Sequence, residues 1–382
     1  MNILTIIVAL LIFSIIVFIH ELGHFSAAKL FGIRVTQFAV GMGPALWKKQ
    51  KGDTTYSLRA IPLGGFCQMD DNTQDKASLK SAAWWKQAIV ILAGAFLNIV
   101  LGFLVFIILQ GSASQINQPV IADFVPNTNL AHTGFQKGDR IVRLNNTDIH
   151  IYEDLTFELQ RITDQPVVVT AKRGSETITE TVLPVKSETR YSYFADRIEV
   201  ETIVDGKSNG TEVYAAPATD EYQEYIGQTG TESSYMLGFV AQSEKPTFAN
   251  VIQSAFYLTI YNIKLVYVSL YELIMGNVPT SDISGPIGII GVIGQAAQIN
   301  WRVLFNIIGL LTVNLGIMNL LPIPALDGCR FLFVLVEAVT RRRIPPEKEG
   351  VIHLIGFALL IVVFLFTIYN DISKLLSGWF AG

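Results

Sequence analysis

The chain alternates between long apolar segments and stretches in which polar residues recur every few positions. Four apolar segments reach the roughly 20 residues that a helix needs to cross a bilayer. They cover residues 3–25, 88–109, 303–321 and 352–368. The first segment has no basic start and no small-residue cleavage site, which favours a retained helix over a signal peptide. We therefore expect a multi-pass α-helical membrane protein with about four transmembrane helices.

Basic residues predict which side of the membrane each connection occupies. Lysines and arginines are frequent between the first and second spans and between the third and fourth spans. By the positive-inside rule both connections are cytoplasmic, which places the long connection between them, and both chain ends, outside the cell. The pattern thus predicts a multi-pass protein of the cell membrane.

The apolar pattern also divides the chain. Residues 1–114 hold the first two spans and a strand-like segment over residues 36–69, and residues 301–382 hold the last two spans. Strand patterns, a short helix and turns at Asn145-Asn146 and Arg173-Gly174 predict a small α+β domain over residues 115–186. The other two segments are a polar extension (187–245) and an amphipathic segment (246–300) that lies on the membrane or packs on the bundle.

Composition supports a membrane protein and excludes some partners. Of the 382 residues, 51% are hydrophobic and only 16% are charged, which is few for a soluble globular protein. The net charge of −4 gives no argument for nucleic-acid binding. Cys67 and Cys329 form no CxxC pair, so neither a disulfide framework nor a cysteine zinc cluster is expected.

A metal-binding pattern ends the first span. His20-Glu21-Leu22-Gly23-His24 places two histidines four residues apart, on one face of a helix. Both imidazoles can bind one zinc ion, and Glu21 beside them can hold and deprotonate a water. The alternative is a polar helix end that reaches the interface. Ionisable residues inside an apolar span favour the zinc site.

A catalytic zinc site needs a third protein ligand. Asp327 follows the third span, on the same predicted cytoplasmic side as His20, and Pro322 and Pro324 interrupt regular helix before it. Its carboxylate is either that ligand or a helix cap, and the residues alone leave both alternatives open. Asn319 is a candidate contact for the oxyanion or the substrate backbone, against a helix–helix hydrogen bond.

Six further positions carry polar groups that we assign to packing or to the surface. Asn98 and Asn314 are expected to bond between helices, with Gly94 allowing close helix approach. The remaining histidines and Cys329 are not expected to bind the metal; the histidines are His132, His150 and His353.

The order of these motifs resembles the site-two protease family of intramembrane metalloproteases, in its bacterial branch that cleaves anti-sigma factors. The resemblance covers nearly the whole chain. Residues 41–44 and 61–66 resemble the family's membrane-associated β-loop, and residues 93–98 and 284–289 resemble motifs of its second span and of the segment before its third. Residues 134–144 resemble part of a PDZ domain.

The resemblance implies one Zn²⁺ per chain, held by His20, His24 and Asp327, with Glu21 as the general base. It implies single-span membrane proteins as substrates and a peptide C-terminus as a ligand of the PDZ-like domain. An extended substrate can add a strand to a free β-loop edge. We expect that edge at Tyr56, Ser57, Leu58, Arg59 and Ala60.

The chain departs from the family pattern in three ways. Cys329 stands where the family usually has glycine, only one PDZ-like domain is found, and the polar stretch 190–234 has no counterpart. Two other functions compete with proteolysis: a non-enzymatic membrane adaptor, against which the intact Glu21 argues, and a divalent-metal transporter. The outer domain and the absence of an inverted repeat in the sequence argue against the transporter.

Overall fold

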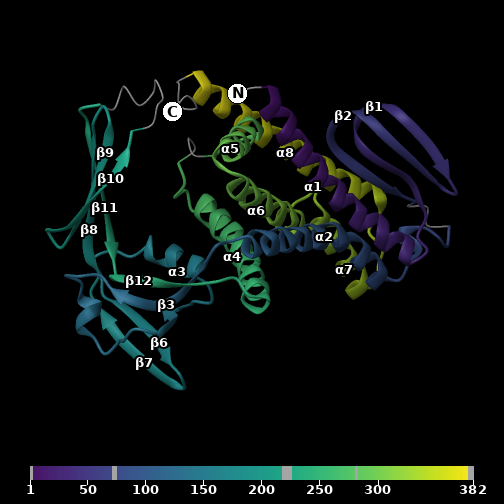
Figure 1. The fold of residues 1–382 in the computed structure, drawn as a ribbon. Helices are drawn as coiled ribbons and strands as arrows, with labels where there is room; N and C mark the ends of the chain where they lie inside the picture. The colour runs from purple at the N-terminus through teal and green to yellow at the C-terminus, as the bar shows by residue number, and fades with distance from the viewer. Residues whose placement is uncertain (1–2, 71–74, 217–225, 280–282, 377–382) are drawn as a thin grey trace. The chain divides into compact units, whose positions relative to one another are not determined.

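The computed structural model describes residues 3–70, 75–216, 226–279 and 283–376 (Figure 1). The chain forms two compact units. One comprises Met1–Leu109 and Asn262–Gly382 and contains most of the helices, and the other, Gln110–Tyr261, contains most of the strands. The helices are α1 (Ile3–Leu30), α2 (Trp84–Gly111), α3 (Tyr152–Leu159), α4 (Phe248–Ile274), α5 (Pro286–Ile299), α6 (Trp301–Leu320), α7 (Asp327–Thr340) and α8 (Pro346–Leu376).

Five helices in the described part are long and apolar enough to cross a membrane: α1, α2, α4, α6 and α8. Each of the four predicted spans coincides with one of them, and the last residue of the third span lies just beyond the end of α6. The fifth, α4, lies in the segment that the sequence predicted as amphipathic, and it meets the same criterion of length and composition. The chain is a multi-pass membrane protein.

Small residues set the helix packing in this unit. A Cβ atom on Gly102 of α2 would lie 2.5 Å from Val313 of α6, and one on Gly309 would lie 2.4 Å from Phe106. The later residue of α2, Phe106, contacts the earlier residue of α6, Gly309. The two helices therefore run in opposite directions. Close approach through glycine is how membrane helices gain van der Waals contact without a hydrophobic driving force.

A compact sheet follows α1. Strands β1 (Val35–Lys51) and β2 (Thr54–Met69) are long enough to fold back on each other twice. Phe38 pairs with both Tyr56 and Cys67, and the register shifts around Gly41 and Gly43, whose positive φ values of 84° and 82° favour glycine. Residues 37–40 therefore have partners on both sides, and residues 65–69 have a partner on one side only within the described chain.

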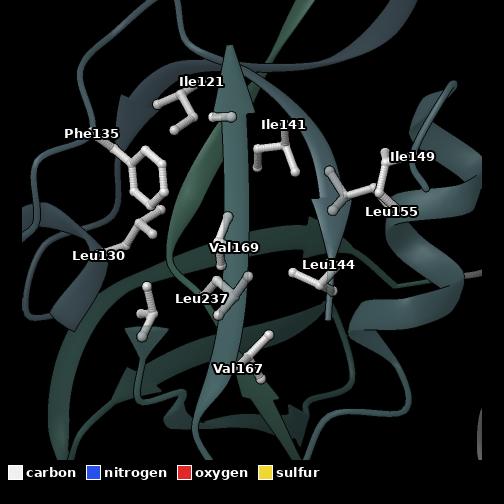
Figure 2. Packing of buried hydrophobic residues seen from close by; sticks show 12 residues of the cluster. Ile121, Leu130, Phe135, Ile141, Leu144, Ile149, Leu155, Val167, Val169 and Leu237 are labelled. Carbon is white, nitrogen blue, oxygen red and sulfur yellow. The ribbon is translucent and has the colours of Figure 1, made fainter. Parts of the chain in front are cut away.

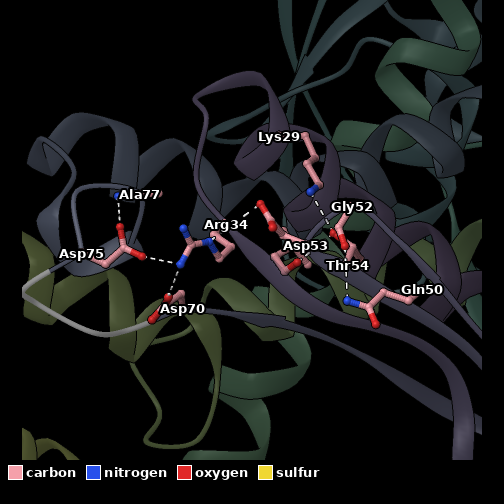
Figure 3. A network of polar contacts seen from close by, with 10 residues as sticks. Lys29, Arg34, Gln50, Gly52, Asp53, Thr54, Asp70, Asp75 and Ala77 are labelled. Carbon is pink, nitrogen blue, oxygen red and sulfur yellow. Dashed lines mark hydrogen bonds and ion pairs between the residues drawn. The ribbon is translucent and has the colours of Figure 1, made fainter.

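Polar contacts fasten this sheet to the end of α1 (Figure 3). The Lys29 ammonium donates to Thr54 Oγ1 at 2.8 Å, and this hydroxyl donates to the carbonyl of Val35 at 2.7 Å. Arg34 forms ion pairs with Asp70 and Asp75, which lie just beyond β2. The sheet is thus held at the end of the helix that carries the metal-binding pattern.

The second unit has a core of its own (Figure 2). Its main sheet has the strand order β12-β3-β4-β6-β7, with β5 on β4. Alternate residues of β6 (Val167–Arg173), such as Val169 and Ala171, are buried against Ile141 and Leu155, as expected for a strand with one covered face. The other strands are β3 (Ile116–Phe124), β4 (Arg140–Leu144), β5 (Thr147–Asp148), β7 (Glu176–Val182) and β12 (Phe239–Glu244).

The predicted turns at Asn145-Asn146 and Arg173-Gly174 are confirmed by the register of the flanking strands, which pair Leu144 with Thr147 and Arg173 with Glu176. The predicted polar extension is corrected in two respects. It contains a second sheet, β10-β9-β8-β11, and its last strand, β12, belongs to the main sheet beside β3. The second sheet comprises β8 (Val185–Tyr193), β9 (Arg197–Val204), β10 (Lys207–Ala215) and β11 (Thr229–Met236).

The second sheet escaped prediction because its strands are polar. Most side chains of β8, β10 and β11 are exposed or half-buried, so no apolar alternation marks them. Residues 217–225 of the predicted extension lie outside the described part of the chain.

Candidate metal centre

Three side chains from distant parts of the chain converge inside the helical unit. His20 and His24 lie one turn apart on α1, and Asp327 is the first residue of α7. Asp327 Oδ2 lies 3.1 Å from His20 Nε2 and 3.2 Å from His24 Nε2, and the two Nε2 atoms are 3.2 Å apart. Within the described residues they form the one group of three or more such side chains with metal-ligand spacing.

The three donor atoms fit a tetrahedral zinc ion. Zinc bonds of about 2.0–2.1 Å to nitrogen and oxygen place neighbouring tetrahedral ligands about 3.3 Å apart. The observed separations of 3.1, 3.2 and 3.2 Å agree with that value. Asp327 Oδ2 is buried and makes no hydrogen bond within the described chain, so this oxygen is directed at the centre, towards the two imidazoles. Three protein ligands leave a fourth position open, as in catalytic sites.

The other ring nitrogens of the histidines face α2. His24 Nδ1 lies 2.8 Å from the carbonyl oxygen of Val90, which fixes the proton on Nδ1 and leaves Nε2 free to bind a metal. His20 Nδ1 lies 3.5 Å from Asn98 Nδ2, and Asn98 Oδ1 is buried without a hydrogen bond in the described chain. Rotating this amide by 180° turns the contact into a hydrogen bond from Nδ1–H to Oδ1.

Glycines let α2 approach the histidines this closely. A Cβ atom on Gly94 would lie 2.4 Å from His24 Nε2 and 2.8 Å from His20 Cε1. One on Gly23 would lie 2.3 Å from the carbonyl oxygen of Ala93. The expected role of Gly94 in close helix approach is confirmed, and the approach occurs at the metal ligands themselves.

The backbone around Asp327 explains why glycine follows it. The N-cap of α7 is Leu326, without a side-chain cap, so the structure favours the ligand over the helix cap for Asp327. A Cβ atom on Gly328 would lie 2.3 Å from the carbonyl oxygens of both Leu320 and Leu321. Only glycine allows α7 to start against the end of α6, where Asp327 can reach the histidines.

The side chain of Glu21 lies against the β1–β2 sheet. Its carboxylate accepts a hydrogen bond from the backbone of Cys67, and its Cγ lies 3.4 Å from the Cβ position of Gly65. Within the described chain, residues 65–69 of β2 have a partner strand on one side only. A free strand edge therefore runs beside Glu21.

The predicted free edge at residues 56–60 is wrong for its first half. Tyr56, Ser57 and Leu58 each pair with β1 on both sides, because β1 folds back across them after Gly43. Their backbone groups are already used within the sheet. The edge next to Glu21 lies instead along residues 65–69.

Comparison with known proteins decides the family. A model described as peptidase family M50 matches residues 8–363. The chain belongs to peptidase family M50. The resemblance drawn from its motifs is thereby confirmed, and the chain is a metalloprotease.

The M50 relatives cover almost the whole chain. A Clostridium perfringens protein with a provisional name as a zinc metalloprotease is 33% identical over 372 residues, covering 96% of this chain and 98% of its own. A Clostridium acetobutylicum protein with the same provisional name is 29% identical, covering 97% and 98%. Zinc metalloprotease RasP of Shouchella clausii is 26% identical over 459 residues, covering 98% and 100%.

The remaining sequence candidates occupy other places in this M50 peptidase. Asn319 is half-buried near the end of α6, and the structure gives it no contact with the three ligands, so its role stays a prediction. His132 and His150 are exposed in the other unit. Cys329 is buried on α7 and lies outside the metal-ligand group. Asn98, which the sequence analysis assigned to packing, lies against His20. Its four-residue spacing from Gly94 places both residues on one face of α2, and this spacing was the available sign that Asn98 lies at the centre.

Proposed function

We propose that the chain is a zinc-dependent endopeptidase that cuts membrane proteins within or at the edge of their transmembrane segments. The observation that carries this proposal is the convergence of two imidazoles and a carboxylate, at 3.1–3.2 Å, between apolar membrane helices. His20, His24 and Asp327 hold the ion, and Glu21 lies next to His20 in sequence with its carboxylate on the substrate side.

The chemistry divides between the ion and the chain. Zinc, when bound, supplies a Lewis acid for the scissile carbonyl and lowers the pKa of water. Glu21 accepts the proton of the attacking water and returns it to the leaving nitrogen. Asn319, at the end of α6, is the candidate donor to the developing oxyanion or to the substrate backbone.

The substrate lies extended along β2. A transmembrane helix has to unwind before a peptide bond can be attacked, and an unwound segment needs partners for its backbone groups in a membrane. Residues 65–69 offer a free edge beside Glu21, and pairing through the main chain does not depend on the substrate's sequence. Single-span proteins with varied transmembrane segments are therefore suitable substrates.

Helix packing supports four crossings with the metal centre near the cytoplasmic side. Thr5, near the start of α1, contacts Gly294 of α5, and Asp371, near the end of α8, accepts hydrogen bonds from the backbone of Gly285 and Gly288. One end of the bundle thus contains the start of α1, the end of α8 and α5. The basic connections lie at the opposite end, so by the positive-inside rule this end is the outer one. On this topology α4 begins and ends outside and lies along the membrane.

The outer unit recognises a peptide end. Strand β12 pairs with β3 on one side and has no other partner strand within the described chain. PDZ domains bind extended C-termini by adding a strand to such an edge. A C-terminus produced by an earlier cut is the ligand that this edge would accept.

Cleavage of a tagged single-span protein by the purified full-length chain in detergent tests the proposal. We expect mass spectrometry to locate the new termini in or next to the apolar segment. We also expect a zinc chelator to stop the cleavage and added zinc to restore it. A cut confined to soluble segments, or a cut retained in Asp327→Ala after loss of zinc, would overturn the proposal.

A further inference from the structure

The turn that presents Asp327 contains an unfavourable backbone conformation. Between the end of α6 at Leu320 and the start of α7, Ala325 adopts a φ of +79°, in the left-handed region that residues with a Cβ atom avoid. Such a conformation persists only where surrounding contacts enforce it. Asp327 follows two residues later, so whatever holds Ala325 also directs the third ligand.

Two hydrogen bonds hold this residue: the backbone N–H of Leu326 donates to the carbonyl of Ile323 at 3.1 Å and closes the turn, and a side chain from α8 binds Ala325 itself. The backbone N–H of Ala325 donates a hydrogen bond of 2.9 Å to His353 Nδ1. The ring of His353 packs edge-on against Phe333 of α7, with ring centroids 5.6 Å apart. Since Nδ1 is the acceptor, the neutral ring carries its proton on Nε2. Nε2 is buried and makes no hydrogen bond to the residues that the structure describes.

A second contact on the same face of α8 meets the preceding residue of the turn. A Cβ atom on Gly356, three residues beyond His353, would lie 2.2 Å from Pro324 Cβ and 2.4 Å from its carbonyl oxygen. One turn before His353, Glu349 forms an ion pair with Lys80, which lies ahead of α2. The face of α8 made by Glu349, His353 and Gly356 is therefore fixed at one end and pressed against the turn at the other.

We propose that His353 is a positioning residue for the third metal ligand: by accepting the N–H of Ala325 it holds the turn in the conformation that directs Asp327 at His20 and His24. This inference rests on the proposed metal centre and adds a residue to it. His353 itself does not touch the reacting atoms. Partners beyond the ligands typically change metal affinity when they are removed, which gives the inference a measurable consequence.

Four variants of the full-length protein in detergent test the inference through zinc affinity, measured by chelator competition. His353→Leu retains bulk but removes the acceptor, and we expect the zinc dissociation constant to rise about 10- to 100-fold. His353→Asn keeps an acceptor near the Nδ1 position and should restore most of the affinity. Glycine adopts a positive φ freely, so Ala325→Gly should partly rescue His353→Leu. Phe357→Leu, at an exposed position of α8, is the matched control and should change nothing.

Equal zinc affinity in His353→Leu and wild type would overturn the inference, and so would equal losses in His353→Leu and His353→Asn. Gly356→Ala provides an independent test if His353→Leu does not fold: displacement of Pro324 should weaken zinc binding, and unchanged affinity would contradict the inference. The affinity readout does not depend on cleavage. A wild type that binds zinc but does not cut would refute the proposed function and leave the test of His353 intact.

Discussion

Asn98 on α2 lies against His20 on α1, with its amide 3.5 Å from Nδ1, while Nε2 of the same ring faces Asp327. The contact orients the ring and selects the tautomer that can bind a metal. We expect Asn98→Ala to raise the zinc dissociation constant about 10- to 100-fold, because His20 loses its second partner. Isothermal titration of the metal-free protein with zinc would measure this change.

A matched pair of variants isolates the role of Asn98. Asn98→Asp keeps an oxygen that can accept from Nδ1–H, so its zinc affinity should exceed that of Asn98→Ala. Asn314→Ala removes an amide from α6, for which the structure gives no contact with the ligands. If Asn314→Ala weakens zinc binding as much as Asn98→Ala does, the specific role of Asn98 is refuted.

The free edge of β2 predicts where the substrate touches the enzyme. A photo-crosslinking residue at Gln68, exposed on the edge beside Glu21, should capture a single-span substrate in inactive Glu21→Gln. The same residue at Lys49, exposed on the opposite edge of the sheet, is the control and should capture far less. Equal capture at both positions would contradict strand addition at residues 65–69. Gel electrophoresis of the crosslinked products measures the difference.

The second unit, Gln110–Tyr261, should lose stability in acid through one ion pair. Asp139 is fully buried and receives two hydrogen bonds of 2.8 Å from Arg173, which holds the pKa of its carboxyl below the usual range. A carboxylate whose pKa is lower in the folded state than in the unfolded state stabilises the fold. Its full contribution is present at a pH above the unfolded pKa of about 3.9. This contribution is lost as the pH falls below that value towards the folded pKa.

Asp139→Asn should therefore destabilise the second unit at pH 7 by about 1–3 kcal/mol, between the costs of breaking exposed and buried pairs. It should also flatten the dependence on pH below 4. Pulse proteolysis in urea, with cleavage followed in the second unit, measures both effects. Asp123→Asn removes a carboxylate whose partner is the exposed Lys137 and serves as the control. A pH profile unchanged by Asp139→Asn would exclude this pair as its source.

Much of the centre could be predicted from the sequence, because its signals are local. The four-residue spacing of His20 and His24 requires only a helix, and an ionisable group inside an apolar span is informative in itself. Asp327 was ambiguous on its own residues, since a carboxylate after a helix also serves as a cap. The family resemblance, now confirmed, predicts that Asp327 is a ligand, and its distances to both imidazoles fit that prediction.

What could not be predicted depends on contacts between distant segments. The position of the free β-loop edge depends on β1 folding back at Gly41 and Gly43, so that Tyr56 gains a second partner. In the sequence, nothing distinguishes His353 from other polar residues near the start of a helix. Its contact with the turn at Ala325 is evident only in the folded structure. The polar second sheet carries no apolar alternation, so periodicity could not reveal it.

The most direct test of the account compares wild type with Glu21→Gln in two measurements on the same preparations: zinc per chain and the rate of cleavage of a single-span substrate. We predict one zinc ion per chain in both proteins, because the substitution leaves the proposed ligands His20, His24 and Asp327 unchanged. We predict cleavage at least about 10²-fold slower in the variant, because it lacks the carboxylate that we propose as the general base. Full cleavage by Glu21→Gln would contradict the account. Zinc in both proteins without cleavage of several unrelated membrane substrates would contradict it too, and would favour the adaptor.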